Sequence, residues 1–225
     1  DLSGRNEWEG TLDSLWQGWE TRYTPGATRQ ALQQQASTAV QAADAAPADG
    51  PLQLRAGEAL QDLGDPKAAE ERYRSALAVS ANDPAALVHL GYCLLDLALA
   101  DDAYAAFAQA LVSAPGDADA ELGQVLALMG SGDASRQSEA RTVLGQLLDR
   151  RPDHVRGQLA AALLAIRTGD AAGAQAALER ALRLDPGNHQ ALAYQSGLAL
   201  AAGDAPQARA AAEQAVAADP ASALA

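Results

Sequence analysis

The chain has little cysteine, little lysine and no long apolar run, and each shortage excludes a class of protein. Cys93 is the single cysteine, so it cannot form an internal disulfide or share a zinc ion with a second thiolate. No segment approaches the roughly 18 apolar residues of a transmembrane helix, so we expect no direct insertion into a membrane. Lys67 is the only lysine, 16 basic side chains stand against 29 acidic ones, and the formal charge is -13. This acidic balance disfavours nucleic acid as a partner, because phosphate groups are bound by clusters of Lys and Arg.

Side chains that carry catalysis are also scarce and scattered. The three histidines, His89, His154 and His189, do not fall at the spacing of a metal site, and no Gly-x-Ser-x-Gly nucleophile motif is present. His89 and Cys93 lie one helical turn apart, which favours a partly buried structural pair over a catalytic one. We therefore expect a protein without enzymatic activity, metal or cofactor.

Alanine dominates the composition, with 57 residues, and it recurs with a fixed period. Ala has the highest helix propensity and lets helix axes approach closely. One set of alanines is spaced by 34, 37, 34 and 34 residues and comprises Ala69, Ala103, Ala140, Ala174 and Ala208. Four residues after each of them, and three further on, stand other apolar residues, which places all three on one helical face. Prolines keep nearly the same step at the end of each unit, at Pro115, Pro152, Pro186 and Pro220.

Each of these helices is preceded by another helix that ends in a tight turn. The turn reads Gly64-Asp65 in the first unit and Gly203-Asp204 in the last. Gly fits the left-handed residue after a helix end, and Asp then caps the following helix. In the second unit Ala98 stands where glycine is expected, which predicts a turn of different construction.

This unit resembles the tetratricopeptide repeat (TPR), most clearly at Leu90, Gly91, Ala103, Phe107, Ala110 and Pro115. The resemblance implies an all-α fold, a right-handed superhelical solenoid of helix-turn-helix repeats. We expect five repeats within residues 50–225, at 50–83, 84–117, 118–154, 155–188 and 189–222. The third repeat carries three extra residues within 130–138, which predicts a longer polar loop or an extra helical turn.

Residues 1–49 form a separate segment that contains all three tryptophans. Its apolar residues recur at the spacing of an amphipathic helix, and they are Trp8, Leu12, Leu15, Trp16, Trp19 and Tyr23. We expect a degenerate helical hairpin that caps the solenoid, because a terminal repeat must cover an exposed apolar edge. Two alternatives stay open. The helix with Trp8, Trp16 and Trp19 docks onto a partner or another copy, or the start of the chain is disordered.

In tetratricopeptide arrays the first helix of each repeat lines the concave face, so the resemblance implies that partners bind there. A second apolar stripe runs beside the packing stripe on these first helices in repeats two to four. It consists of Val88, Tyr92, Leu95, Leu122, Leu126, Met129, Leu159, Leu163 and Ile166. This surplus predicts either tight superhelical packing or an open groove, in which the nine residues bind an amphipathic helix of a partner. The polar residues expected at the rim of such a groove are Arg55, Glu58, His89, Arg156 and Arg167.

These features predict a non-enzymatic scaffold or adaptor that holds a hydrophobic or amphipathic segment of another protein. The third repeat and the Leu184-Asp185-Pro186 ending are similar to bacterial tetratricopeptide domains in assembly, secretion, pilus or cytochrome c maturation systems. The alternative is a self-assembling protein that forms homo-oligomers through the edge of its last repeat or through the tryptophan helix. A single cysteine suits the cytoplasm and the periplasm of a bacterium equally, and Asp1 in place of Met is compatible with an upstream leader or lipid anchor.

Overall fold

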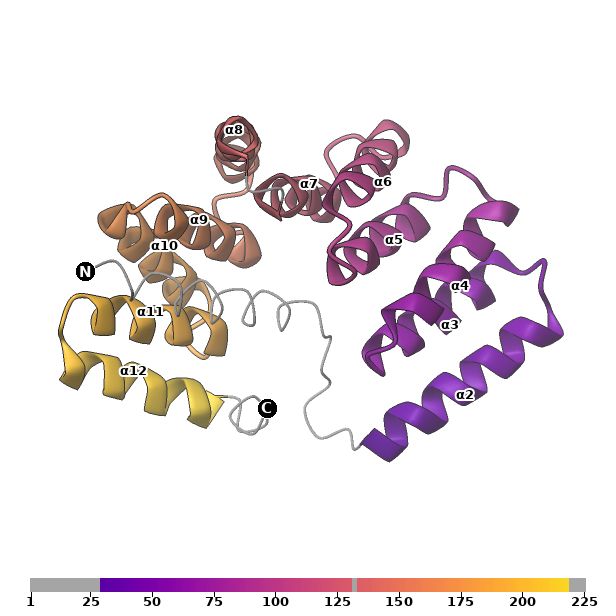
Figure 1. Ribbon diagram of the computed structural model, residues 1–225, viewed down its shortest axis with the longest axis horizontal. Coiled ribbons are helices and arrows are strands. Elements are labelled where there is room, and N and C mark those ends of the chain that lie inside the picture. The colour runs from indigo at the N-terminus through magenta and orange to yellow at the C-terminus, as the bar shows by residue number, and fades with distance from the viewer. Residues whose placement is uncertain (1–28, 131–132, 219–225) are drawn as a thin grey trace. The chain divides into compact units, whose positions relative to one another are not determined.

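The computed structural model describes residues 29–130 and 133–218, and every regular element in these two ranges is an α-helix. The predicted all-α class is therefore confirmed. The helices in Figure 1 are α2 (Arg29–Ala45), α3 (Gly50–Asp62), α4 (Pro66–Val79), α5 (Pro84–Asp96), α6 (Ala100–Ser113), α7 (Ala118–Gly130), α8 (Ala134–Arg150), α9 (Val155–Arg167), α10 (Ala171–Leu184), α11 (His189–Ala201) and α12 (Ala205–Ala218).

The helices pack as hairpins within two compact units, the first ending at Gly123 and the second beginning at Gln124. In the first unit α3 packs on α4 and α5 on α6, while α2 contacts α3 and α4 contacts α5. In the second unit α9 packs on α10 and α11 on α12, while α8 contacts α9 and α10 contacts α11. Each hairpin thus contacts the next one along the chain, as in a helical repeat array.

The turns inside the hairpins have the chemistry that the Gly-Asp pattern predicts. Gly64 and Gly203 adopt the left-handed conformation, with φ of +85° and +80°. Asp65 then accepts a hydrogen bond from the backbone N–H of Ala68 at 3.1 Å, which caps α4. Asp204 repeats this contact at the start of α12. Local sequence therefore sets where these helices begin and end.

The turn at Ala98 corrects one expectation. Ala98 has a φ of +59°, so it adopts the same left-handed conformation as the turn glycines. Its N–H donates to the carbonyl of Leu95 at 2.8 Å, and the N–H of Leu99 donates to Leu94 at 2.8 Å. The same two bonds close the turn at Gly64. The expectation of a differently built turn is wrong, because packing of the α5–α6 hairpin holds an alanine in a conformation that its Cβ disfavours.

We expect Ala98→Gly to raise the free energy of unfolding by about 0.5 to 1 kcal/mol. Glycine removes the left-handed strain of about 1 to 2 kcal/mol, and its greater freedom in the unfolded chain offsets part of that gain. The matched control is Gly64→Ala, which should lose stability, because a Cβ there meets no atom within 4 Å and the change is purely conformational. Urea unfolding measures both variants. An Ala98→Gly protein that is less stable than the parent would contradict this account.

The three extra residues of the third repeat lengthen a helix. α8 has 17 residues and begins six residues before Ala140, whereas α4 has 14 residues and begins three before Ala69. Of the two alternatives, the extra helical turn is therefore the one observed, at the start of α8. Asp133 caps it by accepting a hydrogen bond from the N–H of Ser135 at 2.8 Å. This backbone hydrogen bond holds the pKa of Asp133 below its ordinary value.

Aromatic rings of the second helices fit over glycines of the first helices. Tyr73 and Phe107 are both fully buried, at 0% exposure. A Cβ on Gly57 would overlap the Tyr73 ring, and a Cβ on Gly91 would lie 2.6 Å from the Phe107 ring. Gly123 on α7 faces the same ring, so Phe107 lies between glycines of two successive repeats. Close approach of the helices therefore requires glycine at these positions.

Candidate binding surfaces

The nine residues of the second apolar stripe differ in their exposure. Tyr92 is 8% exposed, and the side chains of Leu122, Leu126, Met129, Leu159 and Leu163 are exposed by 2% or less. The remaining three, Val88, Leu95 and Ile166, are half-buried. A fully buried side chain cannot contact a partner unless it first leaves its packing, so the accessible part of the stripe is confined to these three residues. Partner binding by the stripe stays a prediction.

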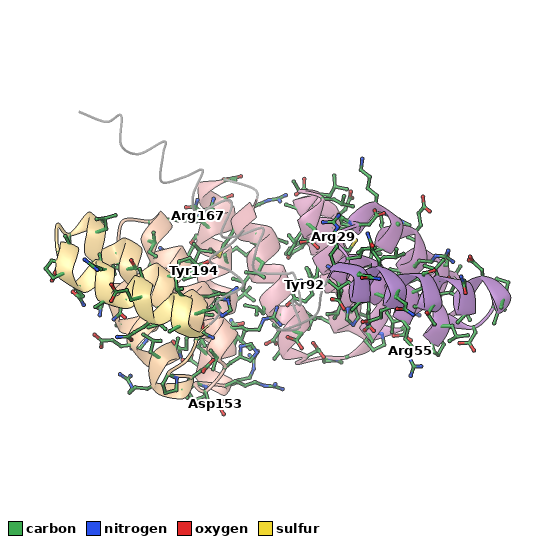
Figure 2. The ribbon with its side chains drawn as sticks, turned by 90° about the horizontal axis from the view of Figure 1, so that it is seen from below. Arg29, Arg55, Tyr92, Asp153, Arg167 and Tyr194 are labelled. Atoms are coloured by element: carbon green, nitrogen blue, oxygen red, sulfur yellow. The ribbon has the colours of Figure 1, made fainter. Side chains whose placement is uncertain are left out.

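Tyr92 shows why most of the stripe is buried. Its ring meets Phe107 edge to face, with centroids 5.0 Å apart at 74°. Its hydroxyl donates to the backbone carbonyl of Asp119 at 2.9 Å, which joins α5 to the start of α7. Figure 2 labels Tyr92 among the helices of the first unit. The position that sequence reasoning assigned to a partner therefore ties one repeat to the next.

A polar network links α3, α4 and α5. Nε2 of His89 lies 3.0 Å from a carboxylate oxygen of Glu58, so two predicted rim residues contact each other. The ring of Tyr73 stacks on His89 with centroids 5.7 Å apart, and its hydroxyl donates to Oε1 of Gln61 at 2.8 Å. Gln61 in turn donates to Asp96 at 2.8 Å. Sequence reasoning missed this network. Its only signal was polar residues, Glu58 and Gln61, at stripe positions of the first repeat.

The three predicted rim arginines lie at the surface. Arg55 on α3 and Arg167 on α9 are exposed, and Arg156 is half-buried. Figure 2 labels Arg55 and Arg167, one in each compact unit. Arg55 and Glu58 also line a cavity of about 590 Å³ between α2 and α3, which we call the α2–α3 cavity. Its size lies within the usual range of binding pockets.

Cys93 has a structural environment. It is fully buried, and its Sγ lies 3.0 Å from the carbonyl oxygen of Pro66, to which the thiol donates. Within residues 29–130 and 133–218, no group of three or more His, Cys, Asp or Glu residues could hold a metal ion. No helix in the same ranges is long and apolar enough to cross a membrane.

Two further predicted surfaces concern the ends of the chain. Trp8, Trp16 and Trp19 lie outside the described residues. At the edge of the last repeat, Ala208, Ala211 and Ala215 are buried, and Val216 is 48% exposed. Most of the alanine edge is thus used inside the protein, and homo-oligomer formation stays a prediction.

Comparison with known proteins identifies the class. The family model for the cytochrome c-type biogenesis protein H TPR domain matches residues 72–191. This match spans more than half of the chain and runs from α4 into α11. The chain is a tetratricopeptide repeat protein. It belongs to the family of cytochrome c-type biogenesis protein H TPR domains.

Solved structures support the fold. TTC0263, a thermophilic TPR protein of Thermus thermophilus, superposes with a TM-score of 0.72 at 23% identity, covering 77% of this chain and 93% of its own. A tetratricopeptide repeat protein of Parabacteroides merdae gives 0.77 at 18% identity, with 84% and 72% covered. PilW, a type IV pilus biogenesis factor, gives 0.70 at 20% identity, with 85% and 88% covered. No curated protein sequence is significantly similar to the chain.

Proposed function

We propose that this chain is a non-enzymatic adaptor that holds a segment of another polypeptide during the biogenesis of c-type cytochromes in bacteria. Tetratricopeptide repeats are protein-interaction modules as a class, and the name of the matching family ties its members to cytochrome c biogenesis. The observation that carries the proposal is the half-buried apolar side chains of Val88 and Ile166. They lie on first helices, α5 and α9, where the resemblance implies that partners bind.

The chemistry of these helices indicates what the partner presents. Val88 and Leu95 lie seven residues apart on α5, so they mark one face of that helix. On α9, Ile166 is followed by the exposed Arg167. A partner with an apolar face and a polar border, such as an amphipathic helix, fits both features. The formal charge of -13 would speed association with a segment of net positive charge.

The proposal is tested with overlapping peptides that cover a bacterial apocytochrome c sequence, titrated with the full chain and followed by fluorescence anisotropy. We expect at least one amphipathic peptide to bind. Val88→Glu should weaken this binding by about tenfold or more, equivalent to about 1.4 kcal/mol, because it places a charge against the apolar face of the peptide.

The matched control is Val112→Glu, which makes the same change on α6 of the same repeat. Val112 is 82% exposed, so this substitution adds the same charge without touching a first helix. Circular dichroism and urea unfolding should show both variants folded. Equal weakening by the two variants would indicate a general charge effect, and unchanged binding by Val88→Glu would show that the first helix of this repeat does not contact the partner. Either result would contradict the proposal.

A further inference from the structure

The two walls of the α2–α3 cavity occupy positions that are buried in the following repeats. On α2 the cavity is lined by Gln35, Ala39 and Ala42, among others. Their equivalents 34 residues further along the chain are Ala69, Tyr73 and Ala76 on α4, which are exposed by 3% or less. On α2, Gln35 is exposed and the two alanines are half-buried. The face of α2 that lines the cavity therefore corresponds to the face of α4 that packs on α3.

The α3 wall shows the same relation. Leu52 and Arg55 line the cavity, the first half-buried and the second exposed. Thirty-four residues further on, their equivalents on α5 are Ala86, which is 1% exposed, and His89, whose side chain is 14% exposed. His89 contacts Glu58 of α3 and stacks on Tyr73 of α4, so this face of α5 packs on the preceding hairpin. The α3 wall is thus shaped to receive a preceding first helix.

We propose that residues 8–23 of this chain occupy the α2–α3 cavity as the first helix of the hairpin whose second helix is α2. Residues 1–28 directly precede α2, and five residues join Tyr23 to Arg29, which is an ordinary length for a helix–helix connection. The amphipathic spacing of Trp8, Trp16 and Trp19 supplies the apolar face that such a helix needs.

A reversal of large and small residues supports this occupant. In the first repeat the small residue, Gly57, is on the first helix and the large one, Tyr73, is on the second. Subtracting 34 gives Tyr23 and Ala39, so the large residue now stands on the first helix and the small one on the second. Total volume at a facing pair is conserved, which is what close packing requires. The tryptophans add bulk opposite Ala42 and the other small residues of the cavity.

The tryptophans make the proposal directly measurable, because all three lie in residues 8–19 and intrinsic tryptophan fluorescence reports on this segment alone. In the full chain we expect a blue-shifted emission and weak quenching by acrylamide. Ala39→Glu places a carboxylate inside the cavity, so it should shift the emission to the red and raise the quenching constant several-fold. Ala45→Glu makes the same change at an exposed position of α2 and should leave both unchanged.

A size swap tests the proposal without introducing a charge. Ala39→Tyr alone should displace the segment through overpacking, and adding Tyr23→Gly should restore the blue-shifted emission by recreating the Gly57–Tyr73 arrangement. Solvent-exposed emission in the parent protein, no response to Ala39→Glu, or a failed rescue would each overturn the proposal. Emission that depends on protein concentration would assign the cavity to a second copy and would equally overturn it.

Discussion

Replacing Phe107 by alanine is expected to lower the free energy of unfolding by about 3 to 5 kcal/mol, the usual cost of removing a buried aromatic ring. The ring is fully buried and lies between glycines of α5 and α7, with the edge-to-face contact to Tyr92 beside it. The glycines carry no side chain that could fill the space left by the ring, so the cavity should stay large. Urea unfolding followed by circular dichroism measures the loss. A change below about 1 kcal/mol would be far smaller than this burial allows.

A double-mutant cycle with Gly123→Ala separates this packing from a general loss of helix contacts. In the parent, a Cβ at Gly123 overlaps the ring of Phe107, so Gly123→Ala alone should destabilise the protein. In the Phe107→Ala background the ring is absent, and the same change should be neutral or stabilising, since alanine favours a helix more than glycine does. Additive effects of the two substitutions would contradict direct packing of the ring on this glycine.

Stability at alkaline pH should depend strongly on Tyr194. This side chain on α11 is 6% exposed, and burial raises its pKa to about 12 from the ordinary value of 10.0. Below pH 10 the phenol is protonated in the folded and unfolded states, so its contribution is fully present. Between pH 10 and 12 the unfolded chain ionises first, and stability falls by up to about 2.7 kcal/mol, since one pKa unit corresponds to about 1.36 kcal/mol.

Tyr194→Phe should remove this part of the alkaline loss. Phenylalanine keeps the ring and has no proton to release, so the variant should resemble the parent at pH 8 and exceed it in stability by about 2 kcal/mol near pH 12. Urea unfolding at a series of pH values measures the difference between the two proteins, in which the titration of other groups cancels. Parallel curves for parent and variant would show that the burial of this phenol does not contribute.

Local turn chemistry was the part of the fold most accessible from the sequence. Gly64 and Asp65 act within a few residues of each other, so the pattern predicts both the left-handed turn and the cap of α4. Ala98 was misjudged because its conformation is imposed by the packing of a whole hairpin, which outweighs the preference of one residue. The three extra residues before Ala140 are visible as a count, but whether they form a loop or a helical turn depends on the cap at Asp133.

The candidate site was only partly accessible from the sequence. Helical periodicity places Val88, Tyr92 and Leu126 on one side of their helices, but it does not say what covers that side. The structure shows that Tyr92 bonds to the next repeat and that Leu126 is buried, while Val88 keeps accessible surface. The contact of Glu58 with His89 joins residues 31 positions apart, and a spacing rule within one helix cannot reveal it.

Hydrogen–deuterium exchange of the full chain, with and without a saturating apocytochrome c peptide, tests most directly whether first helices hold the partner. We predict slower exchange in α5 and α9 and unchanged exchange in α6 and α10, because a bound segment suppresses local opening only where it packs. Protection confined to the second helices, or no protection at saturation, would contradict the proposed binding surface.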